Sequence, residues 1–493
     1  MKRLKINLTL VNIWAFDTNT PHFGLMSLAA FLRNKLPCVD VHIIEGFDPL
    51  LKIVEGLPDI VGFTSDTIAF TKTLALANKL KKYLNVPFII GGVHITAMPE
   101  SFENVFDIGV VGEGEVTLTA LLKIFLEESV FTRNRLGKIK GILFRDGDKV
   151  ISTEFQGQIK ELDDLPYPAW DLVPMEKVYL KDQLNIFGVK RVVSIMTSRG
   201  CPYNCIFCGS PVQWGGVRFH TAEYVLSEIE FLIKKYQIDG IMFWDDLFIA
   251  PKKRLIKLVK YIKEKGLDKK LVFFGYARAN LIDEDVCQLL RSIRVQRLIF
   301  GLETGSERVL QYLKGGSVTV LDNERAVRLC RKYGIAISSG FITGSHGETL
   351  EELKKTYDFI RNNPLDNSHV YLLTPYPGTR LWEESKRMQM VSSEMNFSKL
   401  FVQLPSLELT SFFKKHNHSL IKNRIFLNAE YNNNKEYLGL IFKMQKLVFW
   451  QNLRFYLKTF SRDKTLIVKI FKMKIKIFLK KSKSYRTVVI REN

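Results

Sequence analysis

Three of the six cysteines in this chain lie within eight residues of one another, at Cys201, Cys205 and Cys208. The spacing Cys-x3-Cys-x2-Cys places three thiols on one short segment, which is typical of a metal centre rather than of a disulfide framework. A structural zinc site usually takes four ligands, commonly from two Cys-x2-Cys pairs, and the sequence contains no second pair. Three thiolates with no obvious fourth suit an iron–sulfur cluster in which one iron stays open to another ligand.

The simplest alternative is that these cysteines are small buried hydrophobic residues. Their surroundings disfavour it, because a charged residue and several loop-forming residues accompany them, namely Arg199, Gly200, Pro202, Asn204 and Gly209. The other cysteines, Cys38, Cys287 and Cys330, are isolated. So few cysteines in 493 residues favour a reducing, cytoplasmic setting.

The segment "RGCPYNCIFC" (199–208) resembles the signature of radical S-adenosylmethionine (SAM) enzymes. The resemblance implies that the three cysteines bind three irons of a [4Fe-4S] cluster, while the amino and carboxylate groups of SAM chelate the fourth. One electron from the cluster then cleaves SAM and yields a 5′-deoxyadenosyl radical that abstracts hydrogen. The electron would come from a reductant such as flavodoxin or ferredoxin.

Four later segments also resemble this family: "FWDDLF" (243–248), "GLETGSERVL" (301–310), "GFITGSHGET" (340–349) and "TPYPGTRL" (374–381). The resemblance, with the basic side chain of "YARAN", implies SAM-binding residues at Asp245, Asp246, Arg278, Glu303, Gly340 and Gly344. Taken singly, the aspartates could cap a helix and Glu303 could pair with an arginine. Each segment follows a predicted strand, however, and barrel active sites assemble at strand ends. His346 replaces the commoner proline and is assigned no role, and no catalytic residue is assigned.

Elements that would position these residues follow from the alternation of apolar runs with helical stretches. Strands are predicted at 5–13, 39–45, 59–65, 86–92 and 107–112, followed by a hairpin at 141–152. We therefore expect an α/β protein that begins with a doubly wound, Rossmann-like parallel sheet. After a proline-rich linker, six further strands separated by helices predict a partial (β/α)6 barrel, at 191–198, 240–246, 271–277, 297–303, 334–344 and 368–376.

The expected domains are therefore a cobalamin-binding-like domain at 1–150, a linker at 151–190, a radical SAM barrel at 191–400 and a basic, mainly helical region at 401–493. The first of these rests on a second resemblance. Segments 21–34, 59–67, 89–100 and 110–122 are similar to the cobalamin-binding domain that precedes many radical SAM barrels. All four reach loops after predicted strands, where open α/β sheets bind ligands.

The resemblance implies cobalamin contacts from Gly24, Ser65, Gly91, Gly92, His94, Gly112 and Gly114. Glycines at 91, 92, 112 and 114 would let a large flat macrocycle approach the backbone. His94 is placed in a ligand-facing loop, with no cobalt coordination inferred. "DVHIIEG" (40–46) comes close to a cobalt-coordinating Asp-x-His-x-x-Gly loop, but its glycine is one residue late, so His42 is interpreted as a structural strand residue. "GEGEVT" is not a dinucleotide fingerprint.

Positive charge concentrates at the end of the chain, since residues 401–493 contribute +15 of the total net charge of +21. Segment 464–484 mixes lysines with large apolar residues, and five of its lysines share one helical face. It is interpreted equally well as a basic helix on the inner membrane surface or as a solvated tail. Nucleic acid is a less favoured partner, because no RNA-binding module is recognisable. No apolar run is long enough for a transmembrane helix.

The sequence therefore favours a radical SAM enzyme, with cobalamin, that methylates or oxidatively modifies an unactivated carbon. The sequence does not distinguish between a small molecule, a lipid and a natural product as the substrate. The motif layout is similar to the anaerobic oxidative cyclase group. A tRNA methylthiotransferase is disfavoured, because that class carries three more N-terminal cysteines and Cys38 is alone in the first 190 residues. A non-catalytic iron–sulfur module is the remaining alternative.

Overall fold

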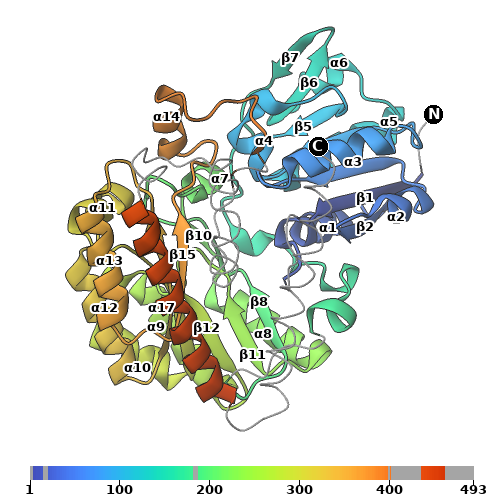
Figure 1. The fold of residues 1–493 in the computed structure, drawn as a ribbon. Helices are drawn as coiled ribbons and strands as arrows, with labels where there is room; N and C mark the ends of the chain where they lie inside the picture. Colours follow the sequence, from blue (N-terminus) through green and yellow to red (C-terminus); the bar gives the residue numbers. More distant parts are fainter. Residues whose placement is uncertain (1–3, 15–19, 181–186, 398–399, 401–434, 461–493) are drawn as a thin grey trace.

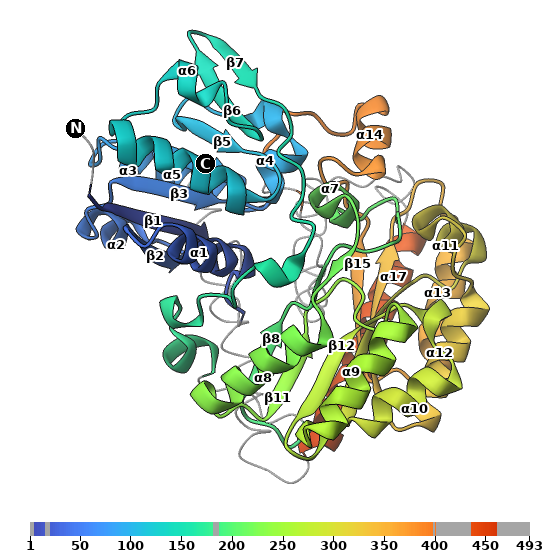
Figure 2. The same ribbon diagram turned by 180° about the vertical axis from the view of Figure 1, so that it is seen from behind.

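The computed structural model describes residues 4–14, 20–180, 187–397, 400 and 435–460, and contains two α/β units joined by a linker (Figures 1 and 2). The first unit is built on a seven-stranded sheet in the order β2-β1-β3-β4-β5-β6-β7. The strands are β1 (Ile6–Ile13), β2 (Val39–Gly46), β3 (Ile60–Thr64), β4 (Phe88–Gly91), β5 (Ile108–Val110), β6 (Ile142–Asp146) and β7 (Lys149–Ser152). β1 to β5 are parallel, and β6 and β7 add an antiparallel hairpin at the edge.

Helices cover both faces of this sheet because its central strands are apolar on both sides. In β1, Leu10 packs into the core under α1 (Phe23–Lys35) and α5 (Gly114–Glu128). Its neighbour Val11 packs into the opposite core, with α2 (Leu50–Glu55), α3 (Phe70–Leu80) and α4 (Val93–Ala97). Successive side chains of a strand point to opposite faces, so a strand with apolar side chains on both faces needs two helical layers. A short α6 (Arg133–Leu136) precedes the hairpin.

The second unit is a six-stranded, wholly parallel partial barrel in the order β15-β14-β13-β12-β11-β8. Its strands are β8 (Val192–Ile195), β11 (Gly240–Phe243), β12 (Val272–Ala277), β13 (Val295–Glu303), β14 (Ala336–Thr343) and β15 (Asn367–Leu372). A two-residue ribbon, β9 (Ser198–Arg199) with β10 (Arg218–Phe219), stands above β8.

The outer helices of the barrel are α8 (Ala222–Tyr236), α9 (Lys252–Glu264), α10 (Glu284–Ser292), α11 (Glu307–Lys314), α12 (Val320–Lys332) and α13 (Leu350–Asn362). Two further helices lie at the upper rim, α7 (Ser210–Trp214) and α14 (Arg380–Arg387). Short single-turn helices occupy Pro99–Ser101, Leu162–Asp164, Trp170–Leu172, Met175–Tyr179, Leu267–Lys269 and Ala279–Leu281. Figure 2 shows the outer helices as one layer around the strands.

The long helix α17 (Lys435–Phe460) covers the outer edge of the barrel, where it lies along β15 and α13 (Figure 1). Asn452 bonds the backbone of Ser368 twice: its Oδ1 accepts from the Ser368 amide at 2.7 Å and its Nδ2 donates to the Ser368 carbonyl at 2.8 Å. An edge strand otherwise exposes such groups for unwanted pairing. This part of the C-terminal region therefore packs with the barrel.

The two units turn the carboxyl ends of their strands toward each other. Helix α4, which follows β4, contacts α7, which follows the cysteine segment. Glu113, which follows β5, forms ion pairs with Arg199 and Arg218 of the β9–β10 ribbon. The Glu45 carboxylate at the end of β2 accepts a 2.6 Å hydrogen bond from the Tyr179 hydroxyl in the linker. Ligands held at either set of strand ends therefore lie at the junction of the two units.

This architecture confirms the predicted fold class, with the qualification that the first sheet is mixed at its hairpin edge. The hairpin itself is confirmed, and Gly147 takes the positive φ of 60° that its turn requires. The basic segment 464–484 lies outside the described residues. Among the helices of the described ranges, none combines the length and apolar character that a bilayer crossing needs.

Candidate functional site

The three-cysteine segment forms a loop between β9 and α7 at the carboxyl end of the barrel. Gly200, immediately before Cys201, adopts φ of 92°, and the carbonyl oxygen of Gly216 fills the place where a Cβ would stand. Only glycine satisfies both conditions, since L side chains rarely adopt this conformation. A backbone bond from the Cys208 amide to the Cys205 carbonyl, at 3.0 Å, tightens the loop.

Asp245, at the end of β11, holds the start of this loop. Its carboxylate accepts hydrogen bonds from the Thr197 amide at 2.7 Å, the Thr197 hydroxyl at 2.8 Å and the Ser198 hydroxyl at 2.7 Å, and the residue is only 1% exposed. These contacts show that Asp245 holds the start of the cluster loop, and its direct contact with SAM stays a prediction. Its neighbour Asp246 is exposed and accepts a 2.5 Å hydrogen bond from Ser210, the first residue of α7.

The thiols share one partly buried environment next to a guanidinium. Arg278 Nη1 donates to Cys205 Sγ at 3.3 Å, and the guanidinium lies 3.9 Å from the centre of the Tyr203 ring. Burial raises the pKa of Cys201 and raises that of Cys208 to about 12, and the nearby Cys205 thiol also raises both. Bound iron would therefore supply the positive charge that deprotonates these thiols.

The donor set fits an iron–sulfur cube better than a single ion. Among the residues that the structure describes, no three His, Cys, Asp or Glu side chains converge as the ligands of one metal ion do. Three cysteines that each bind a different iron need no such convergence. The buried Nε of Arg278 also has no hydrogen-bond partner, so it is available to a further acceptor such as a carboxylate.

Glu303 lies at the end of β13 in a strained and charge-balanced position. Its φ of 63° is unusual for a residue with a side chain, and such strain is commonly found at functional sites. Lys314 of α11 forms an ion pair with it at 3.1 Å, with both side chains under 9% exposed, and also donates to the Gly301 carbonyl. A Cβ at Gly301 would overlap the Glu303 carboxylate, so glycine leaves that side chain its space. The sequence left an arginine pair as the structural alternative for Glu303, and the structure shows Lys314 as its partner.

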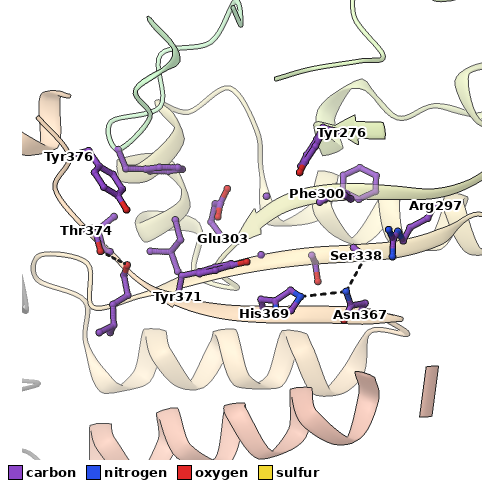
Figure 3. Close-up of a pocket in the computed structure, with 18 residues that line it drawn as sticks. Tyr276, Arg297, Phe300, Glu303, Ser338, Asn367, His369, Tyr371, Thr374 and Tyr376 are labelled. Carbon is purple, nitrogen blue, oxygen red and sulfur yellow. Dashed lines mark hydrogen bonds between the residues drawn. The ribbon is translucent and has the colours of Figure 1, made fainter. Parts of the chain in front are cut away.

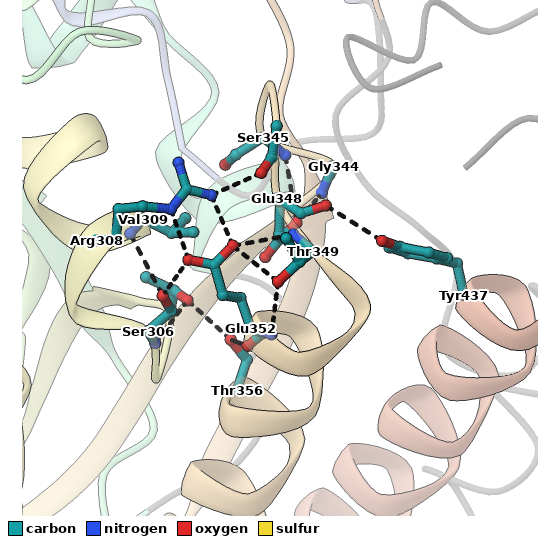
Figure 4. A network of polar contacts seen from close by, with 12 residues as sticks. Ser306, Arg308, Val309, Gly344, Ser345, Glu348, Thr349, Glu352, Thr356 and Tyr437 are labelled. Atoms are coloured by element: carbon teal, nitrogen blue, oxygen red, sulfur yellow. Dashed lines mark hydrogen bonds and ion pairs between the residues drawn. The ribbon is translucent and has the colours of Figure 1, made fainter. Parts of the chain in front are cut away.

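The loop after β14 is tied down by two glutamates of the α13 region (Figure 4). Glu348, which is 1% exposed, accepts hydrogen bonds from the amides of Gly344 at 2.7 Å and Ser345 at 3.3 Å. Glu352 accepts from Arg308 Nε at 2.7 Å and from the Thr349 amide at 2.9 Å. Together they fix the Gly344 loop, where the sequence predicts an adenine contact, against the start of α11.

A cavity of about 500 Å³ opens within the barrel below this rim (Figure 3). Phe207 of the cysteine loop lines it together with Tyr371 and two of the predicted SAM residues, Glu303 and Gly340. Further inside, the wall carries polar side chains from neighbouring strands, namely Arg297, Ser338, Asn367 and His369. Burial raises the pKa of Tyr371 to about 12, so its hydroxyl stays protonated at neutral pH.

The glycines of the N-terminal loops lie close to other parts of the same unit. A Cβ at Gly92, whose φ is 97°, would lie 2.9 Å from the Ser65 amide, and one at Gly112, with φ of 85°, would lie 2.8 Å from the Phe155 ring. At Gly114 and Gly24 the nearest atoms, both 3.0–3.1 Å away, belong to Leu28 and His22. Close internal packing therefore already requires glycine at these positions, and the approach of a macrocycle to them stays a prediction. Gly91 has only ordinary contacts.

His94 lies in the first turn of α4 and is fully buried, whereas the sequence placed it in a ligand-facing loop. Its ring packs on Phe70 at 4.0 Å and on Phe397 at 4.8 Å, and its Nδ1 is 3.2 Å from the Thr67 hydroxyl. Its Nε2 has no hydrogen-bond partner, and burial lowers the pKa of the ring to about 4, so the imidazole is neutral. His42 lies in β2, as predicted, with its side chain half exposed beside Asp40.

The N-terminal unit nevertheless fits a cobalamin domain in its general layout. The carboxyl ends of β1, β3, β4 and β5 face the barrel, and the strand order 2-1-3 places a switch point between β1 and β3. Ser65, directly after β3, is buried and donates to the Asp66 carbonyl at 2.8 Å. Contact of the named residues with cobalamin, and of the rim residues with SAM, stays a prediction.

Several residues that organise the site were not predicted from the sequence. They are Ser27, Glu113, Glu115, Arg199, Arg218, Lys314, Glu348 and Glu352. Glu113 and Glu115 were visible in "GEGEVT", and Arg199 in the cysteine motif, but their pairing across 84 or more positions had no local signal. The capping box of α13, Thr349 with Glu352, was a readable signal.

Comparisons with known proteins agree with this geometry. Residues 195–360 match the Radical SAM superfamily, and residues 10–122 match the B12 binding domain. An uncharacterized methyltransferase of Pyrococcus horikoshii is 34% identical over 418 residues, covering 82% of this chain and 87% of the relative. The chain therefore belongs to the radical SAM enzymes that carry an N-terminal B12-binding domain. Its cofactors are a [4Fe-4S] cluster, SAM and cobalamin, and it is an enzyme of the methyltransferase or cyclase type.

An anaerobic magnesium-protoporphyrin IX monomethyl ester cyclase of Cereibacter sphaeroides is 28% identical over 371 residues, which is 71% of this chain and 58% of the cyclase. The solved structure of the cobalamin-dependent SAM radical enzyme OxsB, with aqua-cobalamin bound, superimposes with a TM-score of 0.66. It shares 17% identity and covers 95% of this chain and 75% of its own, so it supports the fold alone.

Removing the charge of Glu352 should destabilise the protein in a pH-dependent way. Its hydrogen bonds with Arg308 lower the pKa of Glu352 to about 2. A carboxyl whose pKa is lowered by folding stabilises the protein above its unfolded pKa and loses that contribution as the pH falls. We expect Glu352→Gln to lower the thermal unfolding midpoint at pH 7. The difference in midpoint between wild type and variant should narrow as the pH falls from about 4.5 towards 2.

Thermal unfolding at pH 7, 4 and 3 measures this difference. The matched control is Glu351→Gln, which removes an exposed carboxylate one position earlier on α13. A loss of stability that is the same at every pH, or equal in the two variants, would contradict the assigned role of Glu352.

Proposed function

We propose that this chain is a cobalamin-dependent C-methyltransferase that acts on an unactivated carbon of a small molecule, a lipid or a natural product. The observation that carries the proposal is that three cysteine thiols, with Arg278 against Cys205, belong to the loop whose Phe207 lines the Glu303 cavity. Methylation is favoured over oxidative cyclisation because the relative from Pyrococcus horikoshii, which aligns over most of both chains, is named a methyltransferase. Cyclisation is the second candidate, supported by the more distant cyclase.

When bound, the cluster supplies the electron that cleaves SAM to a 5′-deoxyadenosyl radical, and cobalamin carries the methyl group. The residues of the chain position and protect this chemistry. Cys201, Cys205 and Cys208 would hold three irons, and Asp245 would keep their loop in register with the barrel. Arg278 would meet the carboxylate of SAM with its unpartnered Nε while its Nη1 donates to Cys205.

The remaining rim residues would hold the nucleoside. Glu303 is paired with and oriented by Lys314, and its carboxylate oxygens can accept hydrogen bonds from ribose hydroxyls. The backbone between Gly340 and Gly344, whose end is held by Glu348, would lie against adenine. A cavity of about 500 Å³ has the size of a small-molecule site, which supports a small substrate group inside the barrel. Nucleic acid is not required.

We further propose a cytoplasmic location and reduction by a flavodoxin or a ferredoxin. All six cysteines are free, and thiolate-bound clusters need a reducing environment. Contact of segment 464–484 with the inner membrane surface stays a prediction, because this segment lies outside the described residues.

Replacing one cluster ligand tests the radical chemistry. Protein reconstituted without oxygen should bind about four irons and release 5′-deoxyadenosine on reduction with SAM. Cys205→Ala should lose both properties, because two thiolates cannot hold the cube. The control is Cys38→Ala, which changes an isolated cysteine of the N-terminal unit and should leave both intact. Undiminished 5′-deoxyadenosine from Cys205→Ala would contradict the assignment of the cluster.

Product stoichiometry separates methylation from oxidation. Methylation uses one SAM as methyl donor to reduced cobalamin and another as radical source, so about one S-adenosylhomocysteine per bound cobalamin should form beside 5′-deoxyadenosine under reducing conditions. Chromatography of the small-molecule products, with and without cobalamin, measures this. If 5′-deoxyadenosine forms alone under both conditions, the oxidative alternative is favoured and the methyltransferase proposal is wrong.

A further inference from the structure

A buried cluster of four charged side chains joins the two units where their strand ends meet. Arg199 Nη2 pairs with Glu115 at 2.6 Å, and its Nη1 pairs with Glu113 at 3.1 Å. Arg218, which lies opposite Arg199 in the β9–β10 ribbon, pairs with the same oxygen of Glu113 at 2.7 Å. All four side chains are between 4% and 13% exposed. We refer to them as the interdomain charge cluster.

The polar groups of this cluster are extensively paired. Glu113 Oε2 accepts from the Ile159 amide at 2.8 Å and from Arg218 Nη1 at 3.1 Å. Ser27 of α1 donates to Glu115 at 3.0 Å and accepts from Arg199 at 3.1 Å. Two positive and two negative charges therefore balance one another. Although burial alone would raise the pKa of Glu113, the Arg218 hydrogen bonds and the Arg199 charge hold it below its usual value.

Stability alone does not explain such an arrangement. Burying ions costs desolvation energy that their pairing roughly returns, so apolar residues of similar volume would hold two domains together equally well. What a forked guanidinium adds is geometry, since it fixes the direction and the distance of the carboxylates that it binds. Buried ion pairs of this kind can therefore set the orientation of two units more sharply than apolar packing does.

Each side of the cluster is attached to a loop with a proposed cofactor role. Glu113 lies between Gly112 and Gly114 in the loop after β5, and Glu115 is in the first turn of α5. Arg199 precedes Cys201 by two residues, and its guanidinium also lies over the ring of Trp214 in α7, 5.3 Å from the ring centre. The ion pairs therefore run directly from the predicted cobalamin loop to the cysteine loop.

We propose that the interdomain charge cluster fixes the spacing between the cobalamin site and the iron–sulfur site, so that Glu113, Glu115, Arg199 and Arg218 are positioning residues for the reaction. This inference rests on the proposed function, because it needs both cofactors. It follows that a substitution on one side of the cluster alters the affinity for the cofactor bound on the other side. A residue with a purely local structural role would not act across the domain boundary.

The experiment changes one unit and measures the cofactor of the other. Glu115→Gln, in the N-terminal unit, is tested by the SAM affinity of the reduced cluster, followed by electron paramagnetic resonance. Arg218→Gln, ten residues beyond the last cysteine, is tested by cobalamin affinity, followed by absorbance. We expect each affinity to fall by about tenfold with near wild-type iron content, since breaking a buried pair leaves an uncompensated charge.

Two comparisons keep the result interpretable. Arg33→Gln breaks an exposed ion pair with Asp171 of the linker, in which both side chains are over 40% exposed, and should change neither affinity by more than about twofold. Arg218→Lys keeps the charge but loses the fork, and should give an intermediate loss of cobalamin affinity even if Arg218→Gln fails to fold.

Suppose that the wild-type protein binds both cofactors, and that Glu115→Gln and Arg218→Lys both bind the cofactor of the other unit with wild-type affinity. That result would overturn this inference and leave the proposed function standing. Wild-type protein that reconstitutes its cluster but binds no cobalamin would overturn the proposed function, and this inference with it.

Discussion

The constraint on which the rest of this structure depends is the meeting of two parallel sheets at their carboxyl ends. A βα unit always places the loop that follows a strand at the same edge, so each sheet gathers its functional loops on one side. Here those two sides face each other, which brings the loop after β5 into contact with the β9–β10 ribbon and α4 into contact with α7. Two cofactors that take part in one reaction can therefore be held at one junction, with the barrel cavity next to the cluster loop.

Within that frame, the residues nearest the proposed cofactors are held by others that need not touch any ligand. Asp245 secures the strand end that leads into the cysteine loop, Lys314 balances Glu303, and Glu348 holds the Gly344 loop. All three are buried and charged, and each has at least one short polar contact. Such residues are costly to bury unless they are paired, and their pairing makes the rim rigid.

Much of the architecture was predictable from local patterns. The strands of both sheets were predicted within a few residues, because apolar runs of strand length alternate with amphipathic helices. The cysteine motif predicted the enzyme class because its three ligands lie within eight residues of sequence. The roles of Asp245 and the glycines were not predictable, since they depend on neighbours such as Ser198 and Phe155 that lie far away in the sequence. His94 illustrates the same limit, because only the fold shows that Phe70 and Phe397 enclose it.

The most direct test of this account is the paramagnetic resonance spectrum of the reduced cluster in the wild-type protein, recorded before and after addition of SAM. If three cysteines leave one iron open, the amino and carboxylate groups of SAM bind that iron and the g-values of the cluster shift. A spectrum that is identical with and without SAM, or a site that takes up zinc in place of iron, would contradict the account.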